Sequence, residues 1–225
     1  LTCHAWGVAH THYPVPQVPT LSVVTIAWIA FAGILFGLTA AWFSRSIGFC
    51  GSHAKKLISY PPLRPVVGGI VIALAVWALG TTKYIGLGVP VIVESFTTQQ
   101  MWYDFALKLI FTTFTIGVGF KGGEVTPLFF VGATLGSALA AIIPLPMSLL
   151  AAVGFVAVFS GATNTPIACT LMGIELFGAE PGLYIGIACV VAYLFSGHTG
   201  IYTAQVVGSP KNILSWREKG SKLHS

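Results

Sequence analysis

Long uncharged stretches alternate with short polar interruptions along this chain of 225 residues. Residues 21–43 contain no charged side chain and, at about 1.5 Å per helical residue, are long enough to cross a hydrocarbon core of about 30 Å. We expect a full membrane span here. The charges and two adjacent prolines of residues 44–65 indicate a cytoplasmic connection. Residues 66–80 then predict a shorter, glycine-rich helix that begins after Pro65.

The second half of the chain is more interrupted. Residues 81–104 are polar and predict a loop with a short helix. Backbone at membrane depth leaves the helical conformation only where protein buries it or where it lines an aqueous cavity, so interruptions mark expected binding sites. The sharpest interruption is the segment 117–127. The apolar runs around it, several of them too short to span a membrane alone, are 105–120, 127–143, 148–159, 166–177 and 182–195.

Composition excludes a soluble globular protein. The mean hydropathy is +0.85, and only 8% of the residues are charged, against about 25% in soluble domains. We therefore predict an all-α, polytopic protein embedded in the lipid bilayer. Its 26 glycines and 13 prolines favour short, broken and closely packed helices. The expected parts are an extramembrane segment over residues 1–20, a membrane domain over 21–207 and a cytoplasmic tail over 208–225.

The formal net charge of +5 comes from two basic clusters, residues 45–64 and 211–222. The positive-inside rule places both clusters on the cytoplasmic side. Basic residues are not interleaved with aromatic ones in a stripe, so no nucleic-acid partner is expected. No metal or other cofactor is expected either, because the four cysteines form no CxxC pair. One group has metal-ligand chemistry but lies in a proline-rich stretch typical of an exposed loop: Cys3, His4, His10 and His12.

Four glycines and Pro127 interrupt the apolar pattern between residues 117 and 127 and start a new helix. The first N–H groups of that helix, near residues 124–128, lack acceptors within the helix. Such donors, at the positive end of the helix dipole, favour an anion. Thr126 adds a hydroxyl group beside them. It has two open interpretations: a helix N-cap followed by Pro127 as the first helical residue, or a ligand contact.

Glu124 is the most informative residue of this segment, because an ionisable group inside a membrane segment marks an ion or proton pathway. Partial desolvation favours its protonated form, which proton-coupled transport requires. The alternatives are a carboxylate that complements the helix dipole and an ion pair with Lys121. Tyr202 follows the last apolar run; its hydroxyl group either faces a polar cavity or anchors the chain at the membrane interface.

The run Gly122-Gly123-Glu124-Val125-Thr126-Pro127 and the residues that follow it to Gly136 resemble the Gly-x-Phe-x-Pro signature region of the CLC chloride channel and transporter family. Residues 173–176 are similar to that family's helix near the dimer interface, and 196–205 to its final helix with the anion-binding tyrosine. The resemblance covers about residues 15–210. It implies the C-terminal half of an inverted-repeat helical bundle that forms a homodimer with one pathway per subunit. It also implies a transporter rather than an enzyme.

Glu124 stands where most family members have an apolar residue, and Thr126 stands where alanine is usual. In both positions the sequence resembles the bacterial fluoride/proton antiporters of the family. The resemblance implies that Glu124, Thr126 and Tyr202 line the anion path, that Glu124 couples anions to protons, and that the amides of Glu124 and Val125 donate to the anion. The implied function is fluoride export against proton entry across the inner membrane, which protects the cytoplasm from fluoride.

Two alternatives remain: a voltage-gated chloride channel or chloride/proton exchanger of the same family, and a truncated membrane subunit that moves nothing. The family's Gly-x-Glu-Gly gating motif does not occur in this sequence. We therefore expect the chain to be a fragment or partial gene product. Its missing partner would be the N-terminal half of the same subunit.

Overall fold

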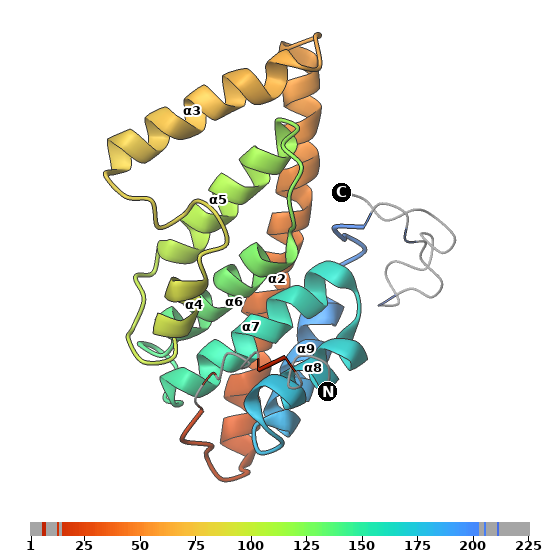
Figure 1. Cartoon of the computed structure of the whole chain (residues 1–225). Helices are drawn as coiled ribbons and strands as arrows, with labels where there is room; N and C mark the ends of the chain where they lie inside the picture. The colour runs from red at the N-terminus through yellow and green to blue at the C-terminus, as the bar shows by residue number, and fades with distance from the viewer. Residues whose placement is uncertain (1–5, 8–12, 14, 203–204, 206–210, 212–225) are drawn as a thin grey trace.

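The computed structural model describes residues 6–7, 13, 15–202, 205 and 211. Within them, the regular elements that position the site are α-helices, labelled as in Figure 1. They are α2 (Val23–Leu57), α3 (Leu63–Leu79), α4 (Val89–Glu94), α5 (Asp104–Gly117), α6 (Val125–Leu139), α7 (Met147–Thr163), α8 (Pro166–Phe177) and α9 (Gly182–Phe195).

Two expected boundaries at the start of the chain are wrong. The connection predicted over residues 44–65 is helical as far as Leu57, because charges alone do not end a helix. Basic side chains in the last turn of α2 instead favour the negative end of its dipole. Helix α3 begins at Leu63, so Pro65 lies inside its first turn rather than before the helix. A proline is tolerated there because the N–H group it lacks has no acceptor within the helix.

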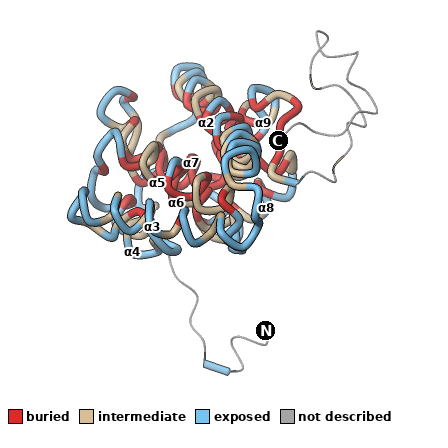
Figure 2. The backbone as a smooth tube through the Cα atoms, turned by 90° about the horizontal axis from the view of Figure 1, so that it is seen from above, coloured by how far each residue is buried: buried red, intermediate tan, exposed pale blue. Residues whose placement is uncertain are grey.

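Helix α7 lies at the centre of the bundle and packs against α2, α6, α8 and α9. Almost all its residues are buried, and Figure 2 shows the buried positions concentrated along α6 and α7. Helix α2 runs the length of the molecule, and α3 leaves from its end and packs only against α5 among the described helices (Figure 1). Many α3 side chains are large, apolar and exposed, as lipid or protein contact requires.

Among the described helices, only α2 is both long and apolar enough to cross a membrane unaided, judged by length and composition. Five others, α3 and α6–α9, are apolar but have 10–17 residues. The expected short and broken helices are therefore present.

A buried carboxylate ties the connections before α5 to that helix. Asp104, at the first position of α5, is 1% exposed and accepts hydrogen bonds from Lys83 Nζ at 2.7 Å and from the Tyr84 hydroxyl at 2.6 Å. The backbone N–H of Gln100 donates to the Ser137 hydroxyl on α6 at 3.0 Å. These contacts hold the ends of α3, α5 and α6 together, because a buried polar group that loses its partner is costly.

Candidate anion-binding site

The expected helix break separates α5 from α6. Helix α5 ends at Gly117, and Gly119 has φ = 105°, a left-handed conformation that glycine adopts without strain. Helix α6 begins at Val125, with Glu124 as its N-cap residue. Thr126 is the second residue of the helix, so its interpretation as the N-cap is wrong.

Several backbone donors at the start of α6 have no acceptor within the helix. The first bond that closes α6 runs from the Leu128 N–H to the Glu124 carbonyl at 3.2 Å. Pro127 has no N–H group, which leaves the amides of Glu124, Val125 and Thr126 as the free donors of the first turn. They form a compact set of N–H groups at the positive end of the helix dipole.

Glu124 and Thr126 are both half-buried. Within the described part of the chain, neither the Glu124 carboxyl nor the Thr126 hydroxyl has a hydrogen-bond partner. The ion pair found among the described residues joins Lys83 to Asp104, so the alternative in which Glu124 pairs with Lys121 is not observed. The Glu124 carboxyl group therefore lacks an adjacent positive charge that would stabilise its ionised form.

Close packing against α7 fixes the position of α6. A methyl group added at Gly132 or Gly136 would lie 2.6 Å from the carbonyl carbon of Gly154 or Leu150, respectively, on α7. Only glycine allows two backbones to approach this closely. The Phe129 ring stacks on the Phe155 ring of α7, with ring centroids 4.0 Å apart. The start of α6 is therefore held by a rigid interface rather than by the loop before it.

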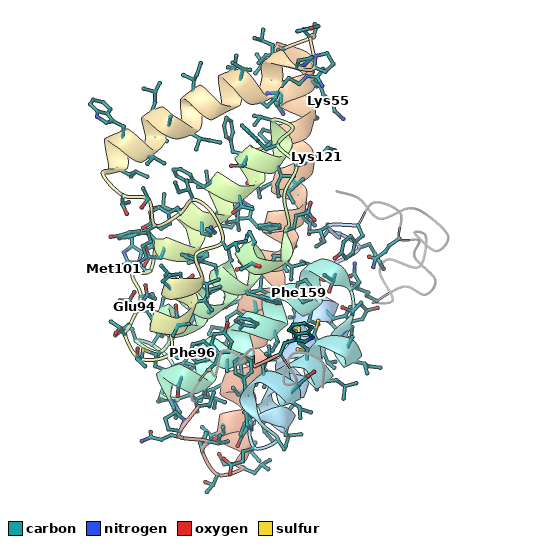
Figure 3. All side chains as sticks on the ribbon, in the orientation of Figure 1. Lys55, Glu94, Phe96, Met101, Lys121 and Phe159 are labelled. Atoms are coloured by element: carbon teal, nitrogen blue, oxygen red, sulfur yellow. The ribbon has the colours of Figure 1, made fainter. Side chains whose placement is uncertain are left out.

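The same contacts show that α6 and α7 are antiparallel, since the later glycine of α6 faces the earlier residue of α7. Phe129 also meets Phe159, labelled in Figure 3, with ring centroids 5.1 Å apart. This register brings the last turn of α7 beside the start of α6. In that turn, the Ala162 carbonyl accepts a hydrogen bond from the Ile201 N–H at 3.0 Å.

Tyr202 is the next residue, and 45% of it is exposed. Its backbone segment thus lies against the end of α7 that adjoins the start of α6. Convergence of the Tyr202 and Thr126 hydroxyl groups on one cavity stays a prediction.

A cavity of about 460 Å³ lies against the segment before α6 and is lined by Gly122, Gly123 and Pro127 among others. Two cationic side chains, Lys108 and Lys121, also line it, and none of its described lining residues is acidic. Lys121 is exposed and lies toward the end of the molecule where α2 and α5 end (Figure 3).

Lys108 is 1% exposed, and its ammonium group donates to the carbonyls of Gly86 at 2.6 Å and Tyr84 at 3.2 Å. It lies 5.0 Å from the centre of the Phe130 ring. Lys108 could not be recognised from the sequence as a feature of the site, because a single charge inside an apolar run carries no local signal of its partners.

Comparison with known proteins decides the family. Residues 1–197 match the profile of the voltage-gated chloride channel (CLC) family. The chain belongs to this family. A chloride/fluoride channel protein of Pseudomonas syringae pv. tomato (strain ATCC BAA-871 / DC3000) is 51% identical over an alignment of 214 residues, and the match covers 92% of this chain and 47% of that protein. The voltage-gated ClC-type chloride channel ClcB of Salmonella dublin is 34% identical and matches 77% of this chain and 45% of its own length.

Two solved structures are also similar. A CLC-type fluoride/proton antiporter superposes with a TM-score of 0.85 and 35% identity over 89% of this chain and 51% of that one. A slow cyanobacterial Cl⁻/H⁺ antiporter superposes with a TM-score of 0.68 and 18% identity, over 84% of this chain and 48% of its own, which shows a shared fold. The chain spans about half the length of the curated relatives it matches.

These findings confirm the resemblance, the all-α CLC-like fold and the class of membrane anion transport proteins rather than enzymes. The roles of Glu124, Val125, Thr126 and Tyr202 stay predictions. Some earlier expectations lie outside the described residues: the group of Cys3, His4, His10 and His12, and the basic cluster beyond Lys211.

Proposed function

We propose that this chain is one half of a CLC-type subunit that exports fluoride in exchange for protons across the bacterial inner membrane. One observation carries the proposal. In a chain that is 51% identical to a chloride/fluoride channel protein, three backbone N–H groups without helical acceptors adjoin a half-buried carboxyl and a half-buried hydroxyl group.

Fluoride selectivity needs many donors in a small volume. Fluoride is small and strongly hydrated, so a binding site has to replace the hydrogen bonds of its water shell. The amides of Glu124 and Val125 supply fixed donors, and the hydroxyl groups of Thr126 and Tyr202 supply adjustable ones. Chloride is larger and less strongly hydrated, so a site with fewer donors suffices for it.

Proton coupling is assigned to Glu124. Its carboxyl group has no ion-pair partner among the described residues and lies where the anion would bind. When protonated, the group donates a hydrogen bond to the anion; when ionised, it repels the anion. Occupancy by fluoride and protonation of Glu124 are therefore linked, so the two ions do not move independently.

The cavity beside the site supports an anionic substrate. Its two lysines and the absence of acidic residues among its described lining give it a positive potential, which raises the local concentration of anions. We assign to this cavity the approach of the anion toward the start of α6.

The complete transporter in this proposal contains a first half of the subunit and a second copy of the whole subunit. Transporters built from inverted repeats bind substrate between the repeats, so the start of α6 needs donors from its counterpart. The exposed apolar side chains of α8 and α9, such as Ile167, Leu171 and Val190, fit the homodimer contact that the family resemblance implies.

The test is fluoride and chloride efflux from liposomes, followed with ion-selective electrodes. Residues 1–225 are co-expressed with the part of the Pseudomonas syringae relative that they do not match. We expect fluoride efflux to exceed chloride efflux, and Glu124→Gln to abolish its dependence on a proton gradient. Glu180→Gln, at an exposed position outside the site, is the matched control and should behave as wild type.

Faster chloride than fluoride efflux would identify a chloride channel or exchanger instead. No efflux of either ion from a folded complex would identify a non-transporting subunit.

A further inference from the structure

A set of hydrogen bonds at the end of α7 gathers the backbone around Tyr202. Helix α7 ends at Thr163, and its C-cap residue Asn164 is the one non-glycine residue of the described chain with a positive φ, 61°. Asparagine tolerates this left-handed conformation better than most residues. Its side chain does more than end the helix, because its amide group binds three different parts of the segment that follows α9.

Each side-chain hydrogen bond of Asn164 joins it to that segment. Its Nδ2 group donates to the Thr199 carbonyl at 3.1 Å and to Gln205 Oε1 at 3.3 Å. Its Oδ1 atom accepts a hydrogen bond from Lys211 Nζ. The Gln205 amide returns to α7 and donates to the Thr163 carbonyl at 3.0 Å. Both N–H groups of the Asn164 amide are thus satisfied within the protein.

Lys211 closes the set from its far end. Its half-buried ammonium group donates to the Ser196 hydroxyl at 2.9 Å and lies 4.2 Å above the Tyr193 ring. Its backbone N–H donates to His198 Nε2 at 3.1 Å. These partners belong to the end of α9 and the turn after it, so Lys211 joins the ends of α7 and α9.

Tyr202 lies between these anchor points. The preceding residue binds the Ala162 carbonyl, and the Tyr202 carbonyl accepts from the Gln205 N–H at 3.1 Å. The last turn of α7, which accepts hydrogen bonds from this segment at the carbonyls of Ala162 and Thr163, adjoins the start of α6. The position of Tyr202 relative to Glu124 therefore depends on this turn.

We propose that Asn164 and Lys211 form a clasp that holds the Tyr202 segment against the end of α7 and so sets the distance between Tyr202 and the start of α6. This inference rests on the proposed function, in which Tyr202 contacts the anion. Asn164 and Lys211 act as positioning residues, since their side chains bind other protein groups rather than the anion.

The test measures the clasp without transport. Tyr202→Cys is introduced into the co-expressed complex after Cys3 and Cys50 are replaced by serine; Cys169 and Cys189 are buried and are kept. The rate of labelling by a methanethiosulfonate reagent in detergent is compared with that of Lys55→Cys, an exposed reference on α2. Because Tyr202 is already 45% exposed, it is a rise of this ratio above that of Tyr202→Cys alone which reports that the segment leaves the end of α7 more often.

Asn164→Gly keeps the left-handed helix end but removes all three side-chain contacts. Lys211→Met removes the ammonium group and keeps an apolar stem. We expect each variant to raise the labelling ratio at position 202 at least about fivefold. Each one removes hydrogen bonds that tie the segment to the ends of α7 and α9, and the groups that lose these bonds then bind water instead. The double variant should exceed the single ones by less than the product of their effects, since the two residues act as a unit.

The matched control is Thr170→Val. It removes a hydroxyl group that bonds to the Pro166 carbonyl within α8 at 2.8 Å, away from the clasp, and should leave the ratio within about twofold. An unchanged ratio in both Asn164→Gly and Lys211→Met would overturn the clasp.

The kinetics of fluoride transport are measured separately. The clasp predicts that Asn164→Gly raises the KM for fluoride more than it lowers the maximal rate, because the site is mispositioned but its groups remain. An increase in labelling with unchanged fluoride kinetics would contradict the positioning role. Absence of fluoride flux in the wild-type complex would contradict the proposed function and leave the labelling result as a test of the clasp alone.

Discussion

The interface between α6 and α7 is the structural support of the candidate site, and Gly136→Ala tests it. A methyl group at this position would lie 2.6 Å from the carbonyl carbon of Leu150 and 3.0 Å from the Cα atom of Ala151. Both atoms belong to the backbone, so neither can rotate away. The methyl group would also overlap the Leu150 carbonyl oxygen, so the two helices have to separate by roughly 1 Å along a fully buried interface.

The expected cost follows from two opposing terms. Overpacking a buried interface costs about 1–3 kcal/mol, while alanine in a helix is favoured over glycine by roughly 0.5–1 kcal/mol. The backbone contact dominates here because the interface is rigid on both sides. A clash with backbone atoms takes the upper part of that range, about 2–3 kcal/mol, so about 1–2.5 kcal/mol remains after the alanine term. At about 2–4 °C per kcal/mol for a chain of this size, this net cost corresponds to a fall in melting temperature of roughly 2–10 °C.

A thiol-reactive fluorogenic dye measures this change directly in a background in which Cys3 and Cys50 are replaced by serine. Cys169 and Cys189 are 1% and 0% exposed, so they react only when the bundle opens. Gly186→Ala on α9 is the matched control, because its new methyl group would meet only the Thr170 side chain at 3.4 Å, an ordinary contact. We expect the control to melt at or above the wild-type temperature. If Gly136→Ala melted within about 1 °C of wild type, the claim that this close contact fixes α6 would be refuted.

Three further predictions concern topology, geometry and pH. Cysteines introduced at Lys55 and Lys219 should react with an impermeant reagent from the same, cytoplasmic face, and reaction from opposite faces would contradict the topology; position 219 lies outside the described residues. Cysteines at Thr126 and Tyr202 should be joined by a short bifunctional reagent, whereas failure with reactive thiols at both positions would reduce Tyr202 to an interfacial anchor. Burial in the clasp lowers the pKa of Lys211 from 10.5 to about 8. Between these two values Lys211 is protonated when the segment is released but largely neutral when it is clasped, so a rise in pH favours the clasped state. The relative labelling at position 202 should therefore fall by up to about tenfold from pH 7 to 9, and Lys211→Arg should remove this dependence while Tyr193 and His198, which also face Lys211, are retained.

Helix positions in the second half of the chain could be predicted closely, because strong local signals mark them. Pro166 begins α8, and Gly178 follows its end with a positive φ of 89°. The extension of α2 beyond residue 44 was not predictable from charge, because amphipathic and charged residues continue a helix as readily as they form a loop. In this region the first strong breakers are the prolines after Leu57.

The residues of the candidate site also differ in how far the sequence alone reveals them. Glu124 and Thr126 stand in a local motif that the sequence exposes directly. Asn164 and Lys108 have no such signal, because their partners lie 35–47 and 22–24 residues away along the chain, respectively. Only the packing of α5 against the connection after α3, and of α7 against the segment after α9, brings these groups together.

The central claim is that the start of α6 is one half of a fluoride pathway. Its most direct measurement records fluoride efflux and proton uptake from the same liposomes, with residues 1–225 alone and with the co-expressed remainder of the Pseudomonas syringae relative. The unpaired donors at the start of α6 need a counterpart, since exposed polar backbone is costly in hydrocarbon. We predict coupled fluoride and proton movement only in the co-expressed sample. Robust, selective fluoride efflux from the chain alone would contradict the account.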